Sequence, residues 1–225
     1  MSFLSKVLAL VEKDFRAEFR TKEMLSVMLI FALLVVVIFG FAFNPTSQVT
    51  RKIFPGILWV AFFFAGILGL NHSFTRERYN QALHGLMIAP VDRSALYFSK
   101  VLSNMAFMLI VELVATPVFL VFFDYSPAGR LPGLVSVVLL ATFGFVAVGT
   151  FLAALAANTR TSQILLPILL FPVVVPVVIA AVQLTAATLA GSSTASFAAW
   201  LRVLVVYDII FLVVPFLLFD YLLEV

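Results

Sequence analysis

The chain has 225 residues, of which 64% are hydrophobic and 11% are charged, with a formal net charge of +3. Soluble domains usually carry about 25% charged residues, so this composition excludes an ordinary water-soluble fold and indicates an integral membrane protein. The absence of cysteine excludes disulfides, thiolate metal sites and iron–sulfur clusters, and no block of basic residues suggests nucleic-acid binding.

The first 22 residues are expected to form an amphipathic helix. Apolar residues recur at every fourth position, at Phe3, Val7, Val11, Phe15 and Phe19. The opposite face carries Lys6, Glu12, Lys13, Arg16 and Arg20. This pattern predicts a helix that lies along the inner membrane surface, either as a lipid anchor alone or also in contact with a protein partner. So many charges at the start also argue against a cleaved signal peptide.

Six segments are long and apolar enough to cross a bilayer, which takes about 20 residues. They lie at residues 24–43, 53–70, 101–123, 133–157, 164–184 and 200–223. The small-residue stretch TAATLAGSSTASFAAW, at residues 185–200, is expected to form an interfacial loop or short helix. The sequence therefore predicts an all-α, polytopic membrane protein with a single transmembrane domain over residues 1–225.

The basic residues in the loops predict the orientation, because cytoplasmic loops are enriched in Lys and Arg. With the N-terminus inside, ten are cytoplasmic: Lys6, Lys13, Arg16, Arg20, Lys22, Arg76, Arg78, Arg93, Lys100 and Arg160. Four are outside: Arg51, Lys52, Arg130 and Arg202. An even number of spans puts both termini on one side, so both are expected in the cytoplasm.

The longest polar stretch between two spans lies at residues 72–100 and begins HSFTRERYNQALHGLMIAPVDR. It is expected to form a short helix over Thr75–Leu86, a break at Pro90, and a second helix with Asp92 as its N-cap. The candidate partner-contacting residues are Arg76, Glu77, Arg78, Leu83, Leu86, Met87 and Pro90. The segment either rests at the interface or is gripped by a soluble cytoplasmic protein.

Two carboxyl groups fall inside spans. Glu112 lies near the middle of the third span and Asp208 lies in the sixth. A charge at that depth costs about 2.5–3.5 kcal/mol on insertion scales. The groups either form a polar path or coupling pair, or are neutral or hydrogen-bonded carboxyls that hold helices together. The second interpretation is preferred here.

Small residues and prolines mark two further spans. The fourth span contains a stripe of small residues at helical spacing, Gly149, Ala153 and Ala157, which suits close helix contact within the subunit or between copies. The fifth contains Pro167, Pro172 and Pro176. Three prolines predict a kinked helix, tolerated only if neighbouring groups, water or local rearrangement satisfy the freed carbonyls.

No catalytic, nucleotide or metal site is recognisable. The two histidines, His72 and His84, lack the spacing and carboxylate companions of a zinc site. The stretch from Gly144 to Thr150 has the glycine spacing of a phosphate loop but lacks its lysine. The chain is therefore expected to be non-catalytic.

The order of amphipathic helix, six spans and a polar helix–proline segment after the second span resembles ABC-2 type exporter permeases. Three stretches narrow this resemblance to the cytochrome c maturation protein B family, also called heme exporter protein B. They read LWVAFFFAGILGLNHSFTRERYNQALHGLMIAPVDRSALYFSK, LLPILLFPVVVPVVIAAV and YDIIFLVVPFLLFDYLLEV. The triple-proline span and the ending that begins at Tyr207 and Asp208 are the more specific parts.

The resemblance implies the ABC-2 permease fold and a bacterial inner-membrane subunit. It also implies a second copy of the chain, other cytochrome c maturation membrane subunits, a periplasmic heme chaperone, and a separate ATPase that binds ATP and contacts residues 72–100. Heme is then the handled species, and the chain itself binds no cofactor. Both histidines fall on the cytoplasmic side, so neither is placed to present heme at the outer face.

Three alternatives remain open. The chain could be an ABC-2 permease for a lipid, polysaccharide or drug, a non-transporting assembly scaffold, or an ion-coupled secondary transporter.

Overall fold

The computed structural model describes residues 3–44, 47–79, 93–125, 129–157, 162–191 and 195–222. These residues form helices and short connections, without a strand among them. The helices are α1 (Phe3–Thr21), α2 (Glu23–Ala42), α3 (Gln48–Tyr79), α5 (Arg93–Phe122), α6 (Leu131–Ala157), α7 (Ser162–Ala190) and α8 (Ala195–Leu222).

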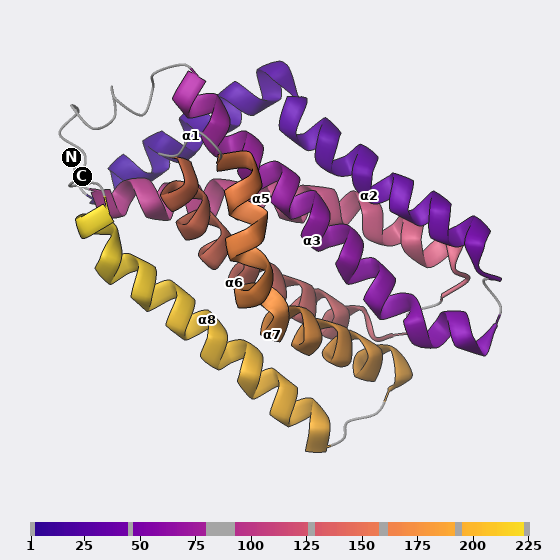
Figure 1. Ribbon diagram of the computed structural model, residues 1–225. Coiled ribbons are helices and arrows are strands. Elements are labelled where there is room, and N and C mark those ends of the chain that lie inside the picture. The colour runs from indigo at the N-terminus through magenta and orange to yellow at the C-terminus, as the bar shows by residue number, and fades with distance from the viewer. Residues whose placement is uncertain are drawn as a thin grey trace.

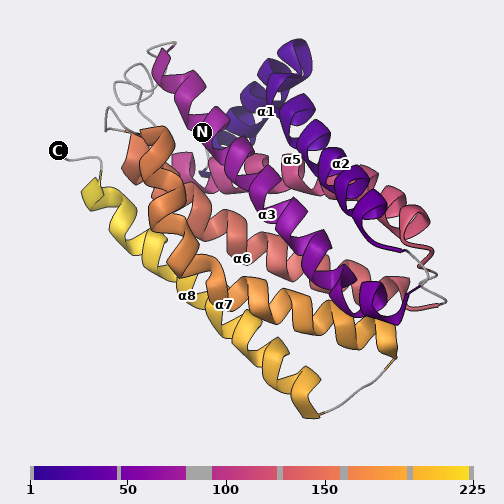
Figure 2. The same ribbon diagram turned by 45° about the vertical axis from the view of Figure 1, so that its right-hand side comes forward.

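Six of these helices, namely α2, α3, α5, α6, α7 and α8, are long and apolar enough to cross a membrane, which confirms the predicted all-α polytopic class. They run back and forth in one bundle, with α1 at one end (Figures 1 and 2). At this end, called the α1 end below, α2 begins, α3 finishes at Tyr79 and α5 starts at Arg93. The start of α2 and the end of α8 lie on the same side, as an even number of spans requires.

The interior is formed mainly by α3 and α6, which are the most buried of the six spans. Aromatic side chains fill much of it: Phe63 of α3 meets Phe145 of α6 edge to face, with ring centroids 4.8 Å apart. Trp59 is 1% exposed and its indole Nε1 donates a hydrogen bond to Thr185 Oγ1 of α7 at 2.9 Å. This bond satisfies the polar atom of a large buried ring and ties α3 to α7.

Three helix boundaries differ from those expected. Residues 75–79 continue the second span instead of starting a separate helix, because α3 is unbroken to Tyr79. In the same way, α5 runs without a break from Arg93 into the third span. Most of the stretch at residues 185–200, expected as an interfacial loop or short helix, belongs to α7 and α8.

Gly191 ends α7 in a way that sequence spacing alone did not identify. Its φ of +70° lies in the left-handed region that favours glycine, and its N–H donates to Thr188 O at 3.2 Å. Such a residue commonly terminates a helix by satisfying one of the last carbonyls. The guanidinium of Arg130, just before α6, donates to Leu189 O in the same last turn. A cation at a helix C-terminus is favourable, so this end of α7 is closed by two groups.

Candidate functional site

Helix α1 packs lengthwise against the first half of α5. The Phe3 ring meets the Phe98 ring with centroids 6.2 Å apart, and Phe15 meets Phe107 at 4.8 Å. Both contacts advance in the same direction along the two helices. Val7, which is 3% exposed, lies on the buried face between them.

The apolar residues of α1 lie on one side of the helix, as the four-residue spacing predicted, but only part of that side is buried in the bundle. Val7 is buried, whereas Leu4, Leu8 and Phe19 are each more than half exposed. At 100° per residue these exposed positions form a row beside the buried face, and the basic residues occupy the remaining side. The helix therefore presents one face to α5, one apolar row and one charged side, which suits a helix at a membrane interface.

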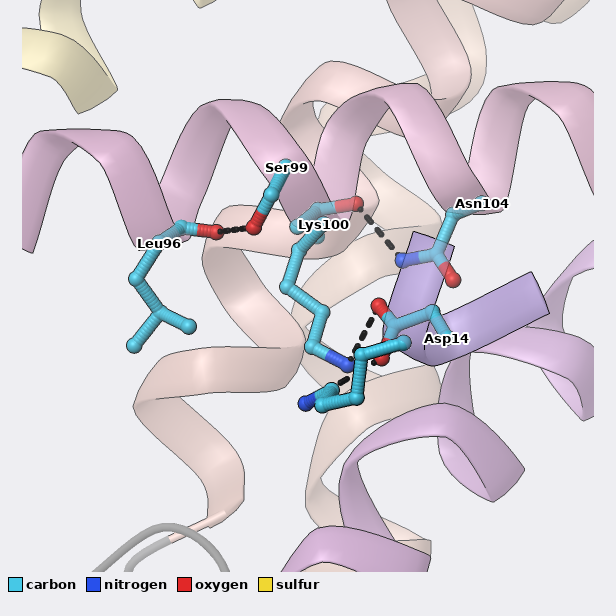
Figure 3. Close-up of polar contacts among 7 residues, drawn as sticks. Asp14, Leu96, Ser99, Lys100 and Asn104 are labelled. Carbon is cyan, nitrogen blue, oxygen red and sulfur yellow. Dashed lines mark hydrogen bonds and ion pairs between the residues drawn. The ribbon is translucent and has the colours of Figure 1, made fainter. Parts of the chain in front are cut away.

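A buried ion pair joins α1 to α5 (Figure 3). Lys100 Nζ lies 2.9 Å from Asp14 Oδ2, and the two side chains are only 5% and 11% exposed. Lys13 Nζ approaches the other oxygen of Asp14 at 3.2 Å. On the α3 side, Lys100 Nζ lies 6.0 Å from the centroid of the Phe74 ring, within the range of a cation–π contact. Residues from α1, α3 and α5 thus surround one ammonium group.

A second buried acid on α1 fixes the start of α2. Glu18 is 3% exposed, and its Oε1 accepts a hydrogen bond from the backbone N–H of Leu25 at 2.9 Å. Lys22, the residue before α2, has φ 57° and makes no side-chain capping bond. Glu18 therefore satisfies an N–H in the first turn of α2 that the usual capping position leaves open.

The proposed partner-contacting residues lie largely outside what the structure describes. The backbone of Arg76, Glu77 and Arg78 belongs to the last turns of α3, but their side chains are not among those described. Leu83, Leu86, Met87, Pro90 and His84 lie outside the described residues. Of the two histidines, His72 is described, and its Nε2 lies 3.5 Å from Glu23 Oε2 at the start of α2.

The two intramembrane carboxyls flank α6 at the same level. Glu112 of α5 is 1% exposed and its Oε1 accepts a hydrogen bond from Thr142 Oγ1 at 2.7 Å. Asp208 of α8 is 6% exposed and packs against Gly144, where a β-carbon would come within 2.2 Å of Oδ1. Within the described residues, neither oxygen of Asp208 has a hydrogen-bond partner. One carboxyl is thus tied to α6 by a hydrogen bond, whereas the other is accommodated by a glycine.

The small-residue stripe on α6 contacts another helix of the same subunit at one position at least. A β-carbon on Gly149 would come 2.4 Å from Leu70 Cδ1 of α3, so the absence of a side chain permits this approach. Ala153 is buried, and the side chain of Ala157 is not among those described.

All three prolines, Pro167, Pro172 and Pro176, lie within α7, which nevertheless remains one helix. The helix bends partway along its length (Figures 1 and 2). Within the proline-rich turns, Val173 O accepts a hydrogen bond from the Tyr207 hydroxyl of α8 at 3.1 Å. A neighbouring helix thus supplies a donor to one carbonyl of these turns, whereas the carbonyls that lose an N–H partner to the prolines are those of Gln163, Ile168 and Pro172.

Sequence reasoning missed Asp14, Glu18 and Lys100 as a group. Asp14 and Glu18 are four residues apart, so they share a helix face with Val7 and Leu10. Acids on the otherwise apolar side of an amphipathic helix were the available signal. Their partners on α5 and α2 could not be assigned, because helical spacing does not say which helix lies alongside.

The fold and these contacts define a multi-pass α-helical membrane protein in which an N-terminal amphipathic helix is joined to the bundle by buried polar contacts. Within the described residues, no group of three or more His, Cys, Asp and Glu side chains could hold a metal ion.

The chain belongs to the CcmB protein family, whose family model matches residues 5–220. It is 28% identical over 192 residues to the heme exporter protein B of Pseudomonas aeruginosa, covering 85% of this chain and 86% of that protein. The heme exporter protein B of Rhodobacter capsulatus is 30% identical over 176 residues, covering 78% and 80% of the two chains. That of Bradyrhizobium diazoefficiens is 27% identical over 210 residues, covering 92% and 93%.

Proposed function

We propose that this chain is the membrane permease subunit of an ATP-driven transporter complex that acts in cytochrome c maturation, in the handling or export of heme and the release of a heme chaperone. A separate ATPase subunit binds and hydrolyses ATP. The complex contains a second copy of the chain and works with other maturation subunits and a periplasmic chaperone in the bacterial inner membrane.

The observation that carries this proposal is the match of the CcmB protein family to nearly the whole chain, residues 5–220. The relatives named above are each called heme exporter protein B. The six apolar helices agree with a role in transport, and the lack of a phosphate-binding loop in the sequence is consistent with an ATPase on a separate subunit.

The ATPase contacts residues 72–100, and both termini lie in the cytoplasm. Two features support this placement. The excess of Lys and Arg predicts that this side is cytoplasmic. In addition, the C-terminal end of α3 and the N-terminal end of α5 both lie at the α1 end of the bundle. Helix α1 packs against the bundle at this same end.

Two measurements test the proposed function. Deleting the gene in the organism that encodes it should abolish heme-stained c-type cytochromes, and the wild-type gene should restore them. A tagged copy should copurify with a soluble ATP-binding-cassette ATPase. If c-type cytochromes persist in the deletion strain, the role in maturation is wrong.

The double substitution Leu83→Asp with Leu86→Asp tests the site of ATPase contact. It should leave the protein in the membrane and abolish ATPase copurification, because a few apolar side chains typically dominate an interface at about 2 kcal/mol or more each. Leu131→Asp is the control, since Leu131 is 51% exposed and lies at the start of α6, away from the α1 end of the bundle. Retention of the ATPase at wild-type yield by the double variant would contradict the docking assignment.

A further inference from the structure

We propose that the Lys100–Asp14 ion pair docks α1 on the start of α5, so that α1 moves together with the helix that follows the ATPase-contacting segment. Both are positioning residues. The mechanical part of this inference rests on the proposed function, whereas the docking of α1 by the pair does not.

The ammonium group of Lys100 lies close to both helices that flank residues 80–92 in the chain. Phe74 lies in the last turns of α3, shortly before the segment at 80–92, and Lys100 lies early in α5, shortly after it. The ammonium of Lys100 contacts the carboxylate of Asp14 at 2.9 Å and lies 6.0 Å from the Phe74 ring centroid. Lys100 therefore connects α1 with α5, and its ammonium also lies near a ring of α3.

The burial of the pair determines the free-energy cost of removing one of its two charges. Exposed ion pairs contribute little, because water competes for both charges. Here the side chains of Lys100 and Asp14 are only 5% and 11% exposed, so each charge has given up most of its water. Removing one partner of such a pair leaves a buried charge without that counter-charge, which is far more damaging than replacing both partners by apolar groups. Docking of α1 therefore requires that both charges are present or that both are replaced by apolar groups.

A second polar contact restricts how α1 can move. Glu18 Oε1 accepts the Leu25 N–H of α2 at 2.9 Å. One turn apart on the same face, Asp14 and Glu18 attach α1 to two different spanning helices. A helix held at two points cannot roll freely about its axis, so a displacement of the start of α5 is passed to α1 as a whole.

The test uses a single thiol on the buried face of α1, which is possible because the natural sequence contains no cysteine. Val7→Cys places the thiol at a position that is 3% exposed. The protein is reconstituted in lipid nanodiscs and labelled with a water-soluble maleimide, and the rate reports how often α1 leaves α5. This readout needs no ATPase.

In the Val7→Cys background, Lys100→Gln and Asp14→Asn should each raise the labelling rate at least about tenfold, since each breaks the buried pair. The apolar pair Asp14→Leu with Lys100→Met should return the rate to within about threefold of the parent, because it removes both charges together. Glu12→Gln is the control: Glu12 forms an exposed pair with Arg16, so its loss should leave the rate unchanged. Rates within about twofold of the parent for both single variants would overturn the docking role.

The mechanical role is tested in cells with the same substitutions and without the reporter cysteine. At equal amounts of inserted protein, each single variant should retain the ATPase but yield less c-type cytochrome, and the apolar pair should restore the yield. A single variant that labels rapidly yet supports wild-type cytochrome yield would overturn the coupling of α1 to the segment. Absence of a copurifying ATPase from the wild type would instead contradict the proposed function and leave the labelling result intact.

Discussion

Gly144→Ala tests whether Asp208 is held against α6 as described. An alanine β-carbon at this position would lie 2.2 Å from Asp208 Oδ1 and 3.2 Å from Tyr207 Cδ1. The first distance is too short for any real contact, so the carboxyl or one of the two helices has to shift. Asp208 has a short side chain on a packed helix and therefore little room to move away.

Two opposing effects set the expected change in the free energy of unfolding. Overpacking of a buried contact costs about 1–3 kcal/mol. Alanine is favoured over glycine in a helix interior by about 1 kcal/mol. Gly144→Ala should therefore destabilise the wild type by a net amount of roughly 0–2 kcal/mol. In the Asp208→Ala background the 2.2 Å clash is absent and only the 3.2 Å approach to Tyr207 remains, so the same change should stabilise by up to about 1 kcal/mol. The coupling energy between the two sites is then about 1–3 kcal/mol.

Thermal unfolding of the purified protein in mild detergent, followed by a fluorescence-based size-exclusion assay, measures this difference. For a chain of this size, 1 kcal/mol corresponds to about 2–4 °C in Tm. Gly56→Ala is the matched control, because a β-carbon there would meet nothing within 4 Å, so it should behave identically in both backgrounds. If Gly144→Ala shifts Tm equally with and without Asp208, the packing described here is wrong.

Three further predictions concern other contacts and the topology. Glu112→Gln keeps an acceptor for the hydroxyl that donates to it, so assembly and cytochrome c yield should match wild type; a variant that inserts normally but supports no cytochrome c would show that the carboxyl itself is needed. Tyr207→Phe removes the donor to Val173 O and should lower stability by about 1 kcal/mol, and an unchanged Tm would argue against that bond. A cytoplasmic reporter fused after Val225 should be active and one inserted near Ala128 inactive, whereas a periplasmic signal at Val225 would contradict the six-span topology.

Local pattern was sufficient for the spanning helices but less so for their ends. Hydropathy identifies the apolar stretches because the bilayer demands about 20 such residues whatever lies beside them. Hydropathy does not show where a helix continues into polar sequence, as α3 does to Tyr79. The backbone hydrogen bonds of a helix form equally well between polar and apolar residues. At residues 185–200, alanine and threonine are compatible with helix or loop, and Gly191 with its left-handed backbone decides where α7 stops.

For the candidate sites, the sequence indicated which residues are unusual, and the structure showed what surrounds them. The carboxyls Glu112 and Asp208 stood out in the sequence because charge is rare in a span, but only the structure gives Glu112 a threonine donor and Asp208 a glycine-lined contact. Side-chain chemistry alone cannot distinguish these surroundings, since they depend on which residues of α6 face α5 and which face α8.

By itself, the sequence determined that this is a six-span membrane protein with an amphipathic helix at its start, and its motifs indicated the family. These properties follow from short-range rules, namely segment length, apolarity and helical period. The attachment of α1 to the bundle by Asp14–Lys100 and Glu18–Leu25 was decided by tertiary structure alone. The physical reason is that Asp14 and Lys100 are separated by more than eighty residues of chain, and only the packing of α1 along α5 brings the two charges together away from water.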